Sequence, residues 1–146
     1  MFHLIKGLIF ITFLFFIGAC RTGVLLKNTP LGLVETKKAI VEVIGNPRKV
    51  ERGGRELISQ YHDRSGQPFE ENSKPNERYY TSVLIQGDRR PYDLEVEVVI
   101  ETMNEMNEFE AYDRSDGMAY ETVEKIRKVL NESREKRNLL DDFRPF

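Results

Sequence analysis

The sequence predicts an α+β domain in which a small antiparallel sheet, made of two hairpins, is packed by two helices. Three observations predict it. Apolar and polar residues alternate through residues 92–101, as in a half-buried strand. Residues 33–44 and 119–130 carry apolar side chains at helical spacing. Connections rich in glycine and proline separate these segments, which gives the order helix, hairpin, hairpin, helix.

Residues 1–20 form a leader ahead of this domain. Lys6 lies in a short basic start, and residues 8–17 are apolar apart from one threonine. The run ends in four residues, in the order Ile17, Gly18, Ala19 and Cys20. This resembles the lipobox signal peptide of a bacterial lipoprotein. The resemblance implies cleavage between Ala19 and Cys20, and attachment of diacylglycerol and palmitate to Cys20, which anchors the chain to a membrane.

A transmembrane anchor and an ordinary secretory leader are the alternatives. Spanning a bilayer takes about twenty apolar residues, and the uninterrupted run here is about half that length. An ordinary leader gives no reason for the only cysteine of the chain to lie at the cleavage point. We therefore expect a signal peptide over residues 1–19, a tether over 20–30 and a single periplasmic domain over 31–146.

Composition disfavours several classes of function. The chain has 22 basic and 24 acidic side chains without a long basic run, so we expect no nucleic-acid partner. His62 is the only histidine after the leader, and no free thiol remains once Cys20 is lipidated, so we expect no metal and no cofactor. Residues 113–117 lack the spacing of a calcium loop. A serine with His62 and an aspartate stays open, but no nucleophile-elbow or phosphate-binding motif occurs, and we predict no catalytic residue.

The first helix is predicted from Leu33 over about eleven residues. Gly45 ends it, because glycine readily adopts the left-handed cap conformation, and Pro47 cannot continue a helix. Two strands, 49–52 and 56–62, then flank a Gly-Gly turn.

Residues 63–77 are mostly polar and contain two prolines, so we expect an exposed loop. A second hairpin follows, with strands over 79–86 and 92–101. Its inward side chains are Leu94, Val96, Val98 and Ile100, and its outward ones are Glu95, Glu97 and Glu101. The outward glutamates predict a solvated face, where the carboxylates can pair with lysine or arginine on a neighbouring strand. An acidic binding face is the alternative.

A polar connection, 103–108, precedes the second helix, for which Ser115 or Asp116 is the expected N-cap. Its core stripe is Ala119, Val123, Ile126 and Leu130. The chain then becomes strongly charged and ends with four apolar side chains, Leu139, Leu140, Phe143 and Phe146. These four are expected to fold back onto the domain or to contact a partner.

Residues 32–61 resemble the BamE/SmpA/OmlA group of small outer-membrane lipoproteins. The matching residues are Gly32 and Leu33 at the start of a helix, Val43-Ile44-Gly45-Asn46-Pro47 at its end, and the strand Glu56 to Tyr61. The chain lacks the tryptophan expected in this strand. The resemblance implies a periplasmic adaptor that supports outer-membrane protein assembly and has no catalytic residues.

We therefore expect a non-enzymatic envelope adaptor or structural component, which contacts the membrane through Cys20 and an envelope protein through its domain. Arg21 favours the outer membrane, facing the periplasm, since an aspartate there would favour inner-membrane retention in enteric-type bacteria.

Two alternatives remain. The first is a carboxylate-based hydrolase of cell-wall glycan. Its candidate acids are Asp63, Glu70, Glu71, Asp88, Asp93 and those of residues 105–110. The second is a carrier of a small apolar ligand. Its candidate aromatics are Tyr79, Tyr80, Tyr92, Phe109 and Tyr112.

Overall fold

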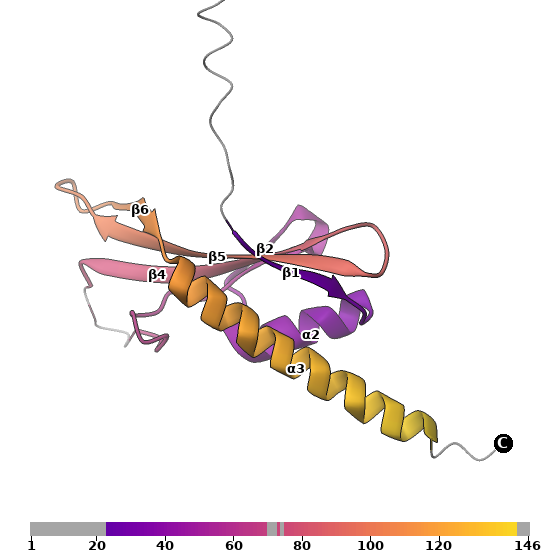
Figure 1. Cartoon of the computed structure of the whole chain (residues 1–146). Helices are drawn as coiled ribbons and strands as arrows, with labels where there is room; N and C mark the ends of the chain where they lie inside the picture. The colour runs from indigo at the N-terminus through magenta and orange to yellow at the C-terminus, as the bar shows by residue number, and fades with distance from the viewer. Residues whose placement is uncertain (1–22, 70–72, 74, 143–146) are drawn as a thin grey trace, which may run out of the picture.

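The computed structural model describes residues 23–69, 73 and 75–142. Its fold is α+β, as predicted: a six-stranded antiparallel sheet with two helices on one face (Figure 1). The strands are β1 (Val24–Thr29), β2 (Lys49–Glu51), β3 (Glu56–Ile58), β4 (Glu77–Gln86), β5 (Tyr92–Met103) and β6 (Phe109–Arg114). The helices are α2 (Leu33–Ile44) and α3 (Asp116–Asp142), with the short 3-10 turn η2 (Arg52–Gly54) between β2 and β3.

The hairpin of β4 and β5 forms the centre of the sheet. Its register runs without a break from Glu77 opposite Thr102 to Gln86 opposite Asp93. The first predicted hairpin also forms, with β2 and β3 joined by η2, and β3 pairs with β4. Both predicted hairpins are therefore confirmed.

Two further strands lie end to end along the other side of β5. Val24 at the start of β1 is opposite Val96, whereas Arg114 at the end of β6 is opposite Val99. The sequence did not predict β6. It also placed residues 20–30 in a tether, and the structure corrects this, because β1 is hydrogen-bonded into the sheet and Leu26 is buried in the core.

Both helices begin where their capping residues predict, and α2 also ends at its predicted stop. In α2, the Glu35 carboxylate accepts the Gly32 N–H at 3.0 Å, and Gly45 ends the helix at φ +75°. In α3, the Ser115 hydroxyl accepts the Met118 N–H at 3.4 Å, which makes Ser115 the N-cap. The structure extends α3 to Asp142, well past the apolar stripe.

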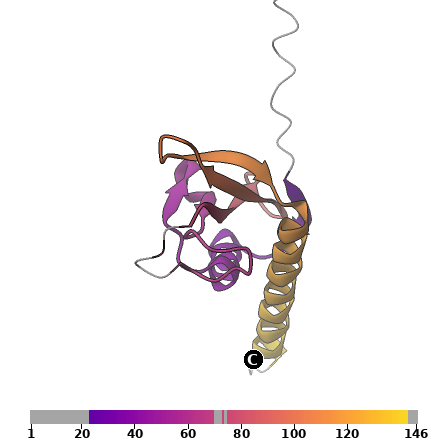
Figure 2. The same ribbon diagram turned by 90° about the vertical axis from the view of Figure 1, so that its left-hand side faces the viewer.

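The hydrophobic core lies between the sheet and the two helices (Figures 1 and 2). Its fully buried side chains include Ile40 from α2, Val83 from β4, Leu94 and Val96 from β5, and Ile126 from α3. All four residues of the predicted α3 stripe are buried. Both views show the opposite face of the sheet without a helix over it, and we call this the helix-free face.

Candidate functional site: the helix-free face

The helix-free face carries buried carboxylates rather than a solvated surface. Glu56, Glu95 and Glu97 are each at most 8% exposed. The prediction of a solvated glutamate face was therefore wrong for Glu95 and Glu97. The pairing with arginine on a neighbouring strand that accompanied it is present for Glu97 and Glu101. Long side chains that lie flat on a sheet can cover one another, so these carboxylates lose water without a second layer of secondary structure.

Each of these carboxylates contacts a donor from a neighbouring element. Arg52 Nε lies 2.8 Å from Glu56 Oε2, and the Ser82 hydroxyl donates to Glu56 Oε1 at 3.0 Å. The Gln86 amide donates to Glu95 Oε2 at 2.7 Å. Buried charges are tolerated when they are paired in this way, so the network fixes side chains on this face. Glu97 Oε2 also lies 3.7 Å from Arg114 Nε.

An alternating stack of arginine and aromatic side chains lies on the same face. It consists, in spatial order, of Phe109, Arg78, Tyr61, Arg48 and Tyr80, and we call it the arginine–aromatic stack. The Arg78 guanidinium carbon is 3.7 Å from the ring centroids of both Phe109 and Tyr61. Such contacts combine cation–π attraction with flat stacking, which suits arginine better than lysine.

Two hydrogen bonds and one ring contact hold this stack in place. Arg78 Nε donates to Glu101 Oε2 at 2.6 Å, and a second Arg78 nitrogen donates to the Tyr61 hydroxyl at 3.1 Å. The rings of Tyr61 and Tyr80 meet edge to face at a centroid distance of 6.1 Å. Desolvation raises the pKa of the Tyr80 hydroxyl, with a further contribution from the negative charge of Glu101. The stack is thus a fixed surface of alternating charge and aromatic rings.

An open pocket of about 830 Å³ adjoins this stack at the end of the sheet. Its described lining comes from the sheet, from the loop before β4 and from the turn between β5 and β6: Gln60, Tyr61, Pro68, Phe69, Ser73, Pro75, Asn76, Arg78, Met103, Asn107 and Phe109. We call it the Arg78 pocket. Among these described residues are aromatic, proline, amide and arginine side chains but no carboxylate.

A smaller cavity, of about 140 Å³, lies on the helix-covered side and contains His62 and Ser59. The Ser59 hydroxyl donates to the Gln60 carbonyl at 2.7 Å and accepts the Thr81 N–H at 2.9 Å. His62 Nδ1 lies 2.8 Å from the Asp63 carbonyl oxygen. Ser59 is therefore engaged with backbone groups, and the structure does not assemble it with His62 as a nucleophile and base.

Two carboxylates considered for glycan hydrolysis, Asp63 and Asp93, accept backbone N–H groups. Asp63 Oδ1 accepts N–H groups of Ser65 and Gln67 at 2.8 and 2.9 Å, and these hydrogen bonds lower the pKa of Asp63. Asp93 accepts the Asn28 N–H at 2.9 Å. Within residues 23–69, 73 and 75–142, no group of three or more histidine, cysteine, aspartate or glutamate side chains is placed to hold a metal.

Several predicted site residues lie outside what the structure describes. These are Ala19, Cys20, Glu70, Glu71, Phe143 and Phe146. Leu139 and Leu140 belong to α3, but their side chains are not described. Lipidation of Cys20 and the contacts of the C-terminal tail stay predictions.

Sequence reasoning missed most of the arginine–aromatic stack. It singled out Phe109 and Tyr80 as lining a ligand site, whereas Tyr79 and Tyr92 belong to the core. Arg48, Tyr61 and Arg78 come from segments that have no common sequence pattern. The only signal in the sequence was that arginine and tyrosine alternate on one strand, with Arg78 and Tyr80 at outward positions of β4.

No family model, curated protein or solved structure matches this chain. In the part of the chain that the structure describes, neither helix is long and apolar enough to cross a membrane.

Proposed function

We propose that the protein is a non-enzymatic adaptor of the bacterial cell envelope, which contacts a membrane through lipidated Cys20 and binds an envelope protein at the Arg78 pocket. The leader supports the proposed membrane contact, because the only cysteine of the chain ends a lipobox-like sequence. The resemblance of residues 32–61 to the BamE/SmpA/OmlA group supports an outer-membrane location facing the periplasm.

The composition of the Arg78 pocket supports the proposed binding of an envelope protein. Protein interfaces are enriched in aromatic side chains and arginine, and their strongest contacts cluster around fixed anchors of these types. Phe109, Tyr61 and Phe69 supply apolar area here, and Arg78 is already held in place before a partner arrives. A fixed guanidinium loses little side-chain entropy on binding, which favours recognition of a partner's backbone or carboxylate.

The first experiment is co-purification from native membranes in mild detergent. Four forms of the tagged full chain are compared: wild type, Cys20→Ala, Phe109→Ser and the control Val34→Ser, which removes an exposed apolar side chain from α2. We expect wild type and Val34→Ser to recover the same envelope protein in stoichiometric amount. Phe109→Ser should lose it while staying membrane-bound, and Cys20→Ala should leave the membrane fraction.

Two results would contradict the proposal. If wild type is recovered alone, the adaptor function fails, and glycan and lipid binding become the next assays. If Phe109→Ser retains the partner as well as wild type does, the partner binds elsewhere on the domain.

A small apolar ligand is the second candidate for the Arg78 pocket. Its volume of about 830 Å³ falls within the range of ligand sites, about 300–1,000 Å³. Mass spectrometry of the protein released from native membranes separates the two cases, since a carrier would retain a bound molecule of defined mass that Phe109→Ser loses.

A further inference from the structure

The predicted lipid attachment point is very close to the folded domain. Cys20 is only four peptide steps ahead of Val24, the first residue of β1. Four steps of fully extended chain span about 14 Å. If Cys20 carries acyl chains in a bilayer, as the proposed function requires, the surface around Val24 is therefore held at the level of the lipid headgroups.

Three elements meet at this surface. β1 begins opposite Val96, in the middle of β5, and β6 ends opposite Val99. The helix α3 begins directly afterwards, and the Ser115 N–H donates to the Val98 carbonyl at 2.9 Å. β1 thus begins at a point on β5 that β6 and the start of α3 also border.

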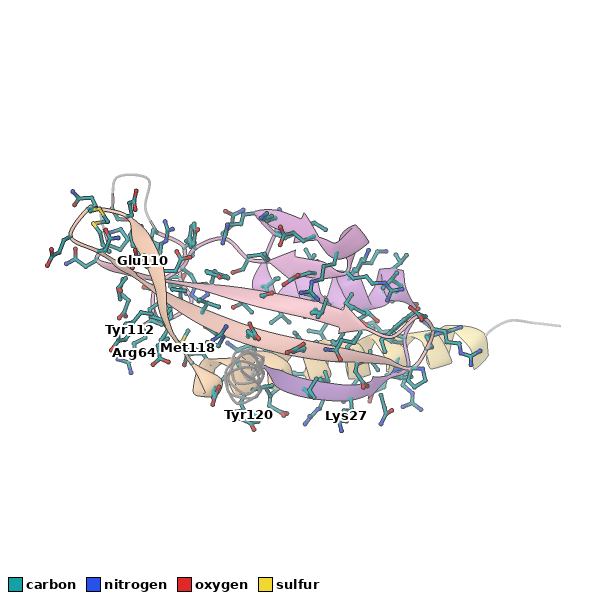
Figure 3. All side chains as sticks on the ribbon, turned by 90° about the horizontal axis from the view of Figure 1, so that it is seen from above. Lys27, Arg64, Glu110, Tyr112, Met118 and Tyr120 are labelled. Carbon is teal, nitrogen blue, oxygen red and sulfur yellow. The ribbon has the colours of Figure 1, made fainter. Side chains whose placement is uncertain are left out.

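Exposed apolar and aromatic side chains are carried by these same elements. Leu25 on β1 is 46% exposed, Tyr112 on β6 is 76% exposed and Tyr120 on α3 is 61% exposed. Figure 3 shows Tyr120 near the start of α3, with Lys27 farther along the same side and Tyr112 at the end where β6 lies. The other exposed large apolar side chains of the described residues are Val34, Val50 and Met106, on α2, on β2 and in the turn before β6.

We propose that Leu25, Tyr112 and Tyr120 contact the lipid headgroup region, so that the β1–β6 edge of the sheet lies against the membrane. Tyrosine suits this position because its ring is apolar and its hydroxyl can stay hydrated, and it is enriched at membrane interfaces. This inference rests on the proposed lipid anchor at Cys20.

Charge on this edge is mixed. Lys27 and Arg114 are basic, whereas Glu110, Asp113 and Asp116 are acidic. The contact therefore depends on the aromatic rings, and it should not require anionic lipid. Met103 at the Arg78 pocket is seven residues along β5 from Val96, or about 24 Å, whereas Tyr112 is three residues along β6 from Phe109, or about 10 Å. The pocket therefore borders the proposed contact surface at its Tyr112 end.

The chain has no tryptophan, so a single tryptophan substitution gives an unmixed fluorescence signal. Full-length Tyr112→Trp, Tyr120→Trp and Val50→Trp variants are purified in lipidated form and placed in phosphatidylcholine vesicles that contain a lipid with a doxyl quencher near the headgroup. Val50 is the control, because it is exposed on β2 at the far edge of the sheet. We expect at least about twofold stronger quenching at positions 112 and 120 than at position 50, unchanged by added anionic lipid.

Equal quenching at all three positions would overturn the membrane-contact surface. The mass of the Cys20 peptide separates this failure from a failure of the proposed function. With an acylated Cys20 and equal quenching, the anchor stands and only the contact surface is wrong. With an unmodified Cys20 and no vesicle binding, both the anchor and the contact surface are wrong.

Discussion

The two faces of the same sheet are buried in different ways. On the helix-covered face, Leu94, Val96 and Val98 of β5 pack against α2 and α3. On the helix-free face, Glu95 and Glu97 of the same strand are nearly as buried, although no helix covers them. Alternation along β5, broken only at the buried Val99, therefore separates an apolar face from one that carries paired carboxylates.

The difference indicates a division of tasks between the faces. Apolar burial contributes most of the stability of a small domain, whereas buried ion pairs contribute little net stability because desolvation offsets their attraction. We therefore assign stability mainly to the helix-covered face, and recognition to the helix-free face with its arginine–aromatic stack. Each prediction below tests this assignment, beginning with the largest expected effect.

Leu94→Ala should have the largest effect on folding. Leu94 is completely buried, and a Leu→Ala change in such a site lowers the free energy of unfolding by about 2–5 kcal/mol. Urea denaturation, monitored by circular dichroism, measures this change in the free energy of unfolding. Leu25→Ala is the matched control on β1, where the side chain is 46% exposed and a change below about 1 kcal/mol is expected. Equal losses for both variants would mean that the helix-covered face is not the principal core.

The helix-covered face could be predicted from the sequence because its signals are local. Alternation along β5, the stop at Gly45 and Pro47, and the α3 stripe each lie within a few residues of one another. The strands β1 and β6 escaped prediction for a physical reason. Of the β6 side chains, only Phe109 is even partly buried, so backbone pairing with β5, and not an apolar pattern, makes it a strand.

The helix-free face could not be predicted for a related reason. Glutamate in alternate positions looks the same in a sequence whether water or arginine surrounds it. Arg78, Tyr61 and Phe109 come from β4, from the segment after β3 and from β6, and only the sheet order brings them together. The Arg78 pocket is a product of this long-range pairing.

Arg78→Met tests the contribution of the helix-free face to stability. Removing the guanidinium leaves the partly buried Glu101 carboxylate without its 2.6 Å donor, and we expect a loss of about 1–3 kcal/mol in the free energy of unfolding. The double variant Arg78→Met/Glu101→Leu should recover part of that loss, since no buried charge is left unpaired. Urea unfolding of both variants measures this, and a double variant less stable than Arg78→Met would contradict the division of tasks.

A pair of glycine substitutions tests how tightly the helix-free face is packed. A Cβ on Gly23 would lie 2.5 Å from Glu95 Cγ, so Gly23→Ala should destabilise the protein by about 1–2 kcal/mol. Gly117→Ala is the control, because nothing lies within 4 Å of its Cβ position in the first turn of α3. It should raise the melting temperature slightly, since alanine restricts the unfolded chain more than glycine does. Tolerance of Gly23→Ala would show that the carboxylate network is loosely packed.

The smallest expected effect concerns the ion pair between Arg137 of α3 and Glu35 of α2. The hydrogen bond from Arg137 lowers the pKa of Glu35 below its ordinary value of 4.5. A lowered pKa means that this contribution is present above pH 4.5 and is lost as the pH falls through the pKa of the folded state. Arg137→Gln should therefore cost less than about 1 kcal/mol at pH 7 and nothing well below pH 4. Urea unfolding of wild type and variant across this range measures the difference, and a difference that persists at low pH would argue against the ion pair.

Site-specific photo-crosslinking in living cells tests the assignment of recognition to the helix-free face most directly. A photoreactive phenylalanine analogue is placed at Phe109 in the Arg78 pocket and, in a second strain, at Val34 on the outer side of α2. We expect one defined crosslinked envelope protein from position 109 and none from position 34. A crosslink from position 34 alone, or no crosslink from position 109 in a folded and membrane-bound protein, would contradict it.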